Sequence, residues 1–181
     1  SSGGVCKTLI IDSLKNGMVD GAYSLKCTDS FPFAQGEFYT REHIPSFGDM
    51  PNSVYHSVMA CTEIDRIQPC KRLMLVGTAC QLRALNSIIK DKCDEVVRVC
   101  IFCKQQKTLD STRFLAKMMG TSVPPNLKFR PRYRGDGWPG IVRVDGFELP
   151  WNRAAQIPFG KRLWTVPGCG ICGDSFGRSE E

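Results

Sequence analysis

The sequence predicts an α/β fold: a mixed, mainly parallel sheet flanked by helices. Two segments carry this prediction. The apolar run 73–76 precedes a helical pattern that begins at Thr78, and the strand-like run 95–103 precedes a second helical pattern that begins at Thr108. Strand, helix, strand and helix in this order are typical of a parallel sheet. The length of 181 residues and the 42% share of hydrophobic residues suffice for one buried core.

The N-terminal segment predicts a helix followed by a strand. Ser2 is a good capping residue, and Gly17 can close the helix in a left-handed conformation. The apolar face of this helix is expected to hold Val5, Leu9, Ile10 and Leu14. A strand is expected at residues 20–25. Residues 28–52 are rich in proline, glycine and polar residues, so we expect a long irregular loop with one short strand at 37–40.

The clearest local signal lies between residues 71 and 90. Residues 73–76 suit a buried strand, Gly77 interrupts the apolar run, and Thr78 begins a helix. Cys80 falls in the first helical turn, where the dipole and the free N–H groups favour the thiolate, which is the form of cysteine that binds metals. The buried face of this helix is expected to hold Leu82, Leu85, Ile88 and Ile89.

A second strand and helix follow directly. The strand 95–103 is expected to end on Cys103, and the next helix is expected to run from Thr108 to Gly120. Ligands of open parallel sheets collect at the carboxyl ends of the strands. Gly77 and Cys103 lie at two such ends, which predicts a site there. The core side of the second helix is expected to hold Phe114, Leu115, Met118 and Met119.

The C-terminal part is expected to contain a hairpin. Asp145-Gly146 separates two short strand-like segments, 141–144 and 147–149, and this dipeptide is a strong hairpin-turn signal. The preceding YRGDGWPG is interpreted as a tight, glycine-rich turn with a packed Trp138. We expect residues 1–125 to form the α/β core and residues 126–181, with the hairpin and a cysteine-bearing loop, to belong to the same domain.

Charge and hydropathy restrict the class of protein. The formal net charge is +6, but the basic residues are scattered and no named nucleic-acid motif occurs, so we expect no nucleic-acid partner. No apolar run approaches the roughly 18 residues that cross a bilayer, and the N-terminus lacks a signal-peptide pattern. We therefore expect a cytoplasmic protein with no membrane span. The two histidines, His43 and His56, are interpreted as surface or turn residues, and the alternative for His56, next to Tyr55, is that it faces a substrate.

Ten cysteines are many for a chain of this length, and they favour metal or redox chemistry over a disulfide framework. Cys80 and Cys103 follow or end two strands, and a C-x2-C pair, Cys169 and Cys172, closes the chain. Four thiolates suit a 4Fe-4S cluster or a structural zinc, and the C-x2-C pair alone also suits a thiol-disulfide enzyme. Burial as small apolar side chains would account for Cys61, Cys93 and Cys100.

Six motifs in order cover nearly the whole chain: SGGVCKTLI with NGMVDGA, NSVYHSV, LMLVGTACQLRAL, VCIFC, YRGDGWPG and PGCGICGDSFGRSEE. They resemble the family of coenzyme F(420) hydrogenase/dehydrogenase beta subunits, in its C-terminal domain type. The GTACQ helix start and the closing C-x2-C are the most specific parts, although Ala79 stands where the family usually has proline. Members often carry a cysteine-rich segment before these motifs and continue beyond them, so we expect a fragment or a minimal version of a longer protein.

The resemblance implies an FAD and a 4Fe-4S cluster bound side by side. The implied cluster ligands are Cys80, Cys103, Cys169 and Cys172, whereas Cys6, Cys27 and Cys100 fall outside the pattern. The implied flavin contacts are Ser2, Gly3 and Gly4 at the first helix start, Asn52, Ser53 and Tyr55 in a loop, and Thr78. Small residues at a helix start let backbone N–H groups approach a phosphate or the carbonyl oxygens of the flavin.

The implied function is that of an iron-sulfur flavoprotein oxidoreductase. It would transfer electrons between a hydride carrier or reducible substrate, FAD and the cluster. Its implied partners are a ferredoxin or hydrogenase/dehydrogenase-type subunits in a larger complex. The alternative is a non-enzymatic binding module that a zinc ion stabilises through the same four cysteines.

Overall fold

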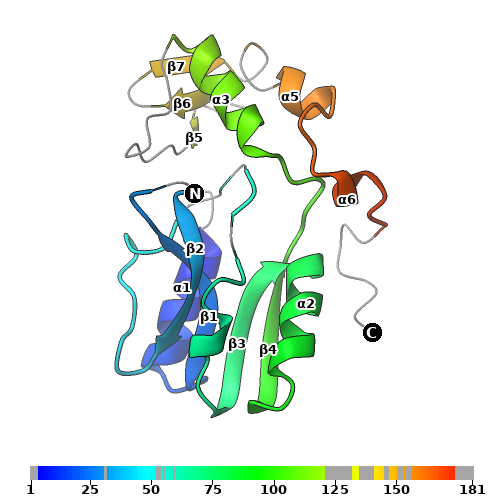
Figure 1. The fold of residues 1–181 in the computed structure, drawn as a ribbon. Coiled ribbons are helices and arrows are strands. Elements are labelled where there is room, and N and C mark those ends of the chain that lie inside the picture. The colour runs from blue at the N-terminus through cyan, green and yellow to red at the C-terminus, as the bar shows by residue number, and fades with distance from the viewer. Residues whose placement is uncertain are drawn as a thin grey trace.

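The fold has two parts, which Figure 1 shows one above the other. The computed structural model describes residues 4–30, 32–51, 54, 56–58, 60–120, 132–134, 141–144, 147–150, 153 and 156–173. The lower part holds a four-stranded sheet with helices α1 (Gly4–Lys15) and α2 (Ala79–Ile89). The upper part holds α3 (Leu109–Met118), a three-stranded sheet and α5 (Gln156–Gly160).

The larger sheet contains β1 (Gly21–Cys27), β2 (Ala34–Thr40), β3 (Cys70–Thr78) and β4 (Cys93–Ile101), in the order β2-β1-β3-β4. β1 and β2 pair antiparallel, whereas β1 with β3 and β3 with β4 pair parallel. The predicted mixed, mainly parallel sheet is therefore confirmed. The carboxyl ends of β1, β3 and β4 share one edge, which faces the upper part in Figure 1.

Helices α1 (Gly4–Lys15) and α2 (Ala79–Ile89) pack on opposite faces of this sheet. Side chains alternate between the faces along β3. Met74 therefore packs in one core cluster with Ile10 of α1, while Leu73 packs in a second cluster with residues of α2. This arrangement confirms the predicted α/β class.

Three residues predicted to be buried on these helices are exposed. Val5 and Leu9 of α1 are 73% and 42% exposed, and Ile88 of α2 is 52% exposed. Lys7 and Ser13 are buried on α1 instead. The reason is that the buried stripe of α1 runs through positions 7, 10, 13 and 14, which excludes positions 5 and 9.

The stretch 28–52, predicted as a loop with one short strand, contains a longer strand than expected. β2 pairs with β1 along its whole length, from Thr40 opposite Gly21 to Ala34 opposite Cys27. Phe33 has a φ of 64° at the turn, which is a conformation that the sequence does not signal. The pairing therefore extends three residues before the predicted start of the strand.

Gly36 lies where β2 passes the segment before the short helix η1 (Ile64–Arg66). Tyr23 Oη donates a hydrogen bond to Ala60 O (2.8 Å) at this crossing, and a Cβ at position 36 would overlap both atoms. We expect Gly36→Ala to lower the free energy of unfolding in urea by about 2–4 kcal/mol. Gly48→Ala is the matched control, because a Cβ there meets only Ser46 Oγ, at 3.7 Å. Equal losses for both variants would contradict this packing.

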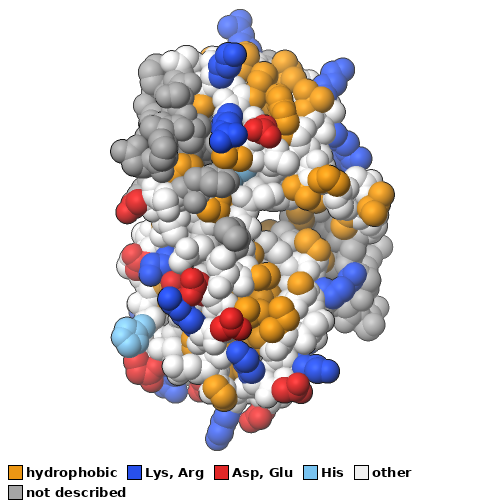
Figure 2. All heavy atoms as spheres, viewed as in Figure 1, with side chains coloured by type: hydrophobic (Ala, Val, Ile, Leu, Met, Phe, Trp, Pro, Cys, Tyr) orange, Lys and Arg blue, Asp and Glu red, His pale blue; other side chains and the backbone are white. Residues whose placement is uncertain are grey.

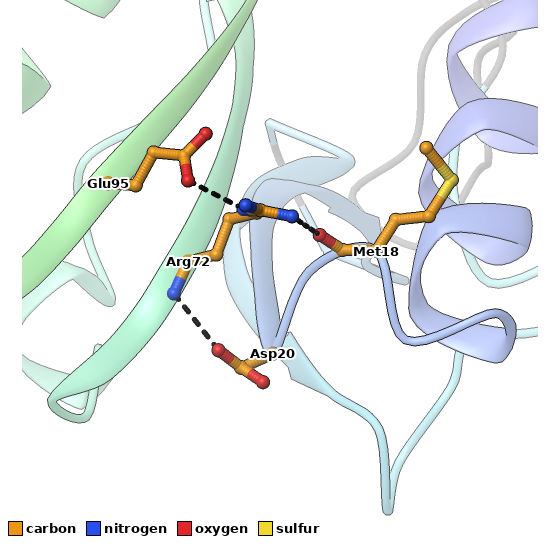
Figure 3. Close-up of polar contacts among 4 residues, drawn as sticks. All are labelled: Met18, Asp20, Arg72 and Glu95. Atoms are coloured by element: carbon orange, nitrogen blue, oxygen red, sulfur yellow. Dashed lines mark hydrogen bonds and ion pairs between the residues drawn. The ribbon is translucent and has the colours of Figure 1, made fainter.

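Arg72 connects the amino end of β3 to its neighbours, as Figure 3 shows. Its Nε donates to Glu95 Oε2 on β4 (2.8 Å), and its Nη1 donates to Met18 O in the turn after α1 (3.1 Å). The backbone N–H of Arg72 donates to Asp20 Oδ2 (2.9 Å). These bonds fix the register of β3 at the edge of the sheet opposite the carboxyl ends.

The upper part begins with α3 (Leu109–Met118), which lies between Thr108 and Gly120 as predicted. Leu115 and Met119 are buried, as expected, but Met118 is 46% exposed. α5 (Gln156–Gly160) and α6 (Pro167–Gly170) are short helices further along the chain.

A second sheet consists of β5 (Arg132–Arg134), β6 (Ile141–Val144) and β7 (Phe147–Pro150), all antiparallel. Val144 pairs with Phe147, which confirms the predicted hairpin. The turn residues 145 and 146, the segment 135–140 with Trp138, and the predicted domain boundary at residue 125 lie outside the described residues. That boundary stays a prediction.

None of the helices within the described ranges is long and apolar enough to cross a membrane. Figure 2 shows Lys and Arg side chains spread over the visible face among acidic ones, without a continuous basic stripe.

Candidate functional site

A cavity of about 440 Å³ lies at the carboxyl edge of the larger sheet. Its walls come from the first turns of α1, the strands β1 and β3, the start of α2, the loop 50–60 and residues 101–106. Pockets that bind small molecules and cofactors commonly have volumes of roughly 300–1,000 Å³. Gly77 and Cys103 both line the cavity, so it lies at the edge where the sequence predicts a site.

Most of the predicted flavin contacts lie outside the described residues, namely Ser2, Gly3, Asn52, Ser53 and Tyr55. Their described neighbours line the cavity. The loop contributes Pro51, Val54 and His56 to the wall of the cavity. The start of α1 contributes Val5, which follows Gly4, the first residue of that helix. The two segments that carry the predicted residues therefore reach the cavity.

Thr78 lies at the junction of β3 and α2 and lines the cavity. Its N–H and its Oγ1 both donate to Gln81 Oε1, at 3.0 Å in each case. These bonds stabilise the first turn of the helix. Thr78 Oγ1 also lies 3.3 Å from Cys80 Sγ. Cys80 is in the first turn of α2, as predicted, and its side chain is exposed.

Of the four predicted metal ligands, Cys103 lines the cavity, and the other three influence its pKa. Cys103 lies two residues beyond the end of β4, whereas the sequence predicted it as the last strand residue. Burial raises the pKa of Cys103, the charges of Cys169, Cys80 and Cys172 raise it further, and a backbone hydrogen bond from Gln105 lowers it. Charges influence one another in this way only over short distances, so the segments that carry Cys80 and the closing C-x2-C pair both approach Cys103.

The closing C-x2-C pair lies on α6 and just after it, and Figure 1 shows α6 beside the N-terminal end of α2. The Gln106 N–H donates to Cys169 Sγ (3.4 Å). A Cβ added at Gly168 or Gly170 would meet no heavy atom within 4 Å, so these glycines leave space beside Cys169. Among the described residues, no three His, Cys, Asp or Glu side chains stand in a metal-binding arrangement. In this structure the described thiols are therefore not closed around one metal centre.

A buried lysine connects the chain after β4 to the chain before α6. Lys107 is 1% exposed. Its Nζ donates to Gln105 Oε1 (3.0 Å), to Leu163 O (3.0 Å) and to Thr165 Oγ1 (2.9 Å). Burial and the nearby Arg162 lower the pKa of Lys107, and Cys169 opposes this shift. Lys107 therefore fixes the path of the segment that leads to Cys169.

Backbone bonds reinforce this connection. Lys107 pairs with Thr165 in an isolated antiparallel bridge, and the Thr108 N–H donates to Trp164 O (2.8 Å). Arg162 and Trp164 have positive φ angles of 55° and 54°. A left-handed conformation costs a non-glycine residue roughly 1–3 kcal/mol, so it persists only where surrounding contacts enforce it. The contacts of Lys107 and Thr108 enforce it here.

Lys7 is a second buried lysine, and it lines the cavity from α1. It is 4% exposed, its Nζ donates to Phe47 O (3.0 Å), and it lies 4.6 Å from the centre of the Phe47 ring. A positive charge in the wall of a shielded cavity attracts anionic ligand groups. The local sequence pattern gave no reason to select Lys7.

His56 is fully buried, so its interpretation as a surface or turn residue is wrong. Its Nε2 donates to Pro32 O (2.9 Å), which leaves Nδ1 to accept from Thr112 Oγ1 (3.0 Å). Both ring nitrogens are therefore used by the neutral side chain. Burial lowers the pKa of His56 below its ordinary value of 6.5, and the bond to Pro32 opposes this shift.

This burial predicts a loss of stability in mild acid. The unfolded chain protonates His56 near pH 6.5, whereas the folded chain holds it neutral to lower pH. The unfolded state then binds more protons, so the free energy of unfolding falls with pH below about 6.5, by at most about 1.4 kcal/mol per pH unit. Urea titrations between pH 7.5 and 5 measure this slope.

His56→Gln is expected to lose this component of the slope. The carboxylates contribute to the pH dependence of stability equally in all variants. The difference in slope between a variant and the parent chain is therefore due to the substituted histidine. His43→Gln is the control, because His43 is exposed. An unchanged slope in His56→Gln would show that the buried imidazole does not cause the acid sensitivity.

The fold and the site together define an α/β protein with a cofactor-sized cavity and four neighbouring cysteines at the carboxyl edge of its sheet. No protein-family profile matches the chain, and no curated protein matches it by sequence. Among solved structures, it is similar to a chain of the F420-reducing NiFe hydrogenase complex from Methanosarcina barkeri, with a TM-score of 0.66 and 16% identity. The match covers 94% of this chain and 59% of that chain. The two chains therefore share a fold over about three fifths of the length of the hydrogenase chain.

Proposed function

We propose that this chain is the flavin- and iron-sulfur-binding part of an electron-transfer oxidoreductase that works within a larger complex. One observation carries the proposal: Cys103 is both a wall residue of the 440 Å³ cavity and a neighbour of the other three candidate ligands. A redox-active small molecule in this cavity would lie directly beside a thiolate-bound metal centre.

Cys80, Cys103, Cys169 and Cys172 would hold a 4Fe-4S cluster. The donor set fits, because thiolates are the usual ligands of such clusters. Three of the four positions follow from local features of this chain: Cys80 from the start of α2, and Cys169 and Cys172 from the segment that Lys107 fixes. The Gln106 N–H that donates to Cys169 Sγ is the type of contact that tunes cluster potentials.

FAD is the ligand that we propose for the cavity. Gly4 begins a helix of 12 residues, so Ser2, Gly3 and Gly4 would offer backbone N–H groups to the phosphates. Asn52, Ser53, Tyr55 and Thr78 would contact the ring system, and Lys7 would add a positive charge. When bound, the flavin supplies hydride exchange and the cluster supplies single-electron exchange. The residues named above would position both groups.

The likeness to a chain of an F420-reducing hydrogenase complex supports a deazaflavin as the hydride carrier and a multi-subunit setting. Because this chain spans 59% of that chain, its substrate and its partners are part of the proposal. The competing proposal, a zinc-stabilised binding module, uses the same four cysteines but gives the cavity no role.

Reduction of bound flavin tests the function. The chain is prepared without oxygen, reconstituted with FAD, iron and sulfide, and mixed in turn with reduced deazaflavin, NADPH or reduced ferredoxin. We expect reduced deazaflavin to bleach the flavin absorbance and the iron-sulfur absorbance to follow. Absence of flavin binding, or a bound flavin that none of the three donors reduces, would refute the proposal.

Lys7→Met tests the flavin site separately. Because a charge-assisted contact in a shielded cavity is lost, we expect FAD to bind at least about tenfold more weakly. Fluorescence titration with FAD measures this affinity. Lys15→Met, at the exposed end of the same helix, is the control and should bind FAD like the parent chain. Equal affinities for all three chains would exclude Lys7 from the flavin site.

A further inference from the structure

Two cysteines outside the candidate site face each other at the opposite edge of the sheet. Cys70 begins β3 and Cys93 begins β4, and the two residues are direct partners in the parallel register. Their sulfur atoms lie 3.3 Å apart, and both are free thiols. Neither lines the cavity, so the proposed function does not use them.

The backbone holds this pair in a fixed position. The Cys70 N–H donates to Lys92 O (3.2 Å), and Lys92 Nζ donates to Ile67 O (3.3 Å). Two residues further along, Arg72 Nε contacts Glu95 Oε2 at 2.8 Å (Figure 3). The register therefore cannot slip without breaking bonds on both sides of the cysteines.

The geometry meets the requirements of a disulfide. Neighbouring strands lie roughly 4.7–4.9 Å apart, and disulfides need Cα atoms roughly 4.4–6.8 Å apart. Both side chains are partly buried at the edge of the core cluster that includes Leu73 and Ile89, so the rest of the fold need not move. Ordinary apolar packing explains two cysteines near a core, but it does not require their sulfur atoms to face each other across a strand pair.

We propose that Cys70 and Cys93 form a reversible disulfide, as a redox modification site that is distinct from the four-cysteine site. The oxidant is a low-molecular-weight disulfide such as oxidised glutathione. The Cys93 thiolate attacks it to form a mixed disulfide and releases one small thiol. Cys70 then attacks the Cys93 sulfur and displaces the second small thiol. The protein pair loses two electrons, and the reduced small thiols carry the electrons and the two protons away.

The order of attack follows from the surroundings of the two thiols. Burial and the neighbouring Cys93 sulfur raise the pKa of Cys70 well above its ordinary value, and the charges of Asp20 and Asp94 act in the same direction. Once Cys93 is bound in the mixed disulfide, its thiol no longer raises the pKa of Cys70, so Cys70 attacks second. The bond would join the amino ends of the strands that lead to Thr78 and Cys103 at the other edge.

Peptide mapping tests this site directly. The full chain is incubated with oxidised glutathione, remaining thiols are alkylated, and the protein is digested with trypsin. We expect the peptide 67–71 to be cross-linked to the peptide 93–98, and dithiothreitol to separate them. Cys100→Ser should keep the cross-link, whereas Cys93→Ser should lose it. Free alkylated Cys70 and Cys93, or glutathione that stays on Cys93, would overturn the proposal.

Thermal unfolding provides a second readout. The bond closes a loop of 23 residues, so the oxidised chain should unfold about 5–10 °C higher than the reduced chain. Cys93→Ser folds without the bond and should show the same Tm under both conditions. An equal rise of Tm in that variant would assign the effect to other cysteines and contradict the proposal.

Discussion

Cys103→Ser is expected to lose most of its iron and sulfide and its ability to pass electrons beyond the flavin. Cys103 is the candidate ligand that lines the cavity, and the other three candidate thiols influence its pKa. A serine hydroxyl is not deprotonated at neutral pH and is a poor ligand for an iron-sulfur cluster. Iron and acid-labile sulfide analysis of anaerobically reconstituted protein measures the loss.

Cys100→Ser is the matched control for this prediction. Cys100 lies three residues earlier on β4, is exposed, and falls outside the ligand pattern. It should keep its iron, and both variants should unfold at the same urea concentration before reconstitution. A full complement of iron in Cys103→Ser, or an equal loss in Cys100→Ser, would remove Cys103 from the ligand set.

Lys107→Met is expected to reduce both stability and iron content, although Lys107 is not a ligand. The substitution leaves Leu163 O without its buried donor and removes the bonds from Nζ to Thr165 Oγ1 and to Gln105 Oε1, which keeps its bond from Thr165. Loss of a buried, fully bonded charge costs roughly 2–4 kcal/mol, which urea unfolding of the chain measures. The segment before α6 is then no longer fixed, so reconstitution should yield less iron per chain than the parent protein.

Lys117→Met is the control for this effect. Lys117 is exposed and does not line the cavity, so its loss should change neither quantity by a measurable amount. If Lys107→Met is destabilised but binds iron normally, the lysine stabilises the fold without positioning Cys169. If it is neither destabilised nor iron-poor, the hydrogen bonds of Lys107 do not have the role assigned here.

The elements that could be predicted from the sequence depend on local patterns. The run 73–76, Gly77 and the helical spacing after Thr78 are contiguous, and β3 and α2 appear where expected. Gly17 and Gly120 follow their helices with positive φ angles, which the local sequence also predicts, since glycine is common at helix ends. The hairpin at 141–149 also has a local signal in its Asp-Gly turn.

The predictions from sequence are wrong where contacts between segments distant in sequence determine the structure. His56 is buried because Pro32 and Thr112 surround it, and neither is near it in sequence. β2 extends further than expected because β1 pairs with its whole length. Val5 and Leu9 are apolar but exposed, because the stripe of α1 that packs on the sheet runs through positions 7, 10, 13 and 14 instead.

The candidate site likewise has a part that local sequence patterns predict and a part that depends on tertiary contacts. Cys80 could be placed from the start of α2, and the C-x2-C spacing marks Cys169 and Cys172. No sequence pattern shows that these cysteines meet beside Cys103, because the connection through Lys107 joins residues more than 50 positions apart. The Cys70 and Cys93 pair depends on the register of two parallel strands, which periodicity alone does not define.

The composition of the anaerobically isolated chain tests the central claim most directly. Metal, acid-labile sulfide and flavin are measured on the same sample, with electron paramagnetic resonance after reduction. We predict about four iron atoms and about four sulfides per chain, together with one FAD and the signal of a reduced 4Fe-4S cluster. A colourless protein with a single zinc ion and no flavin would contradict this account and support the zinc-stabilised module.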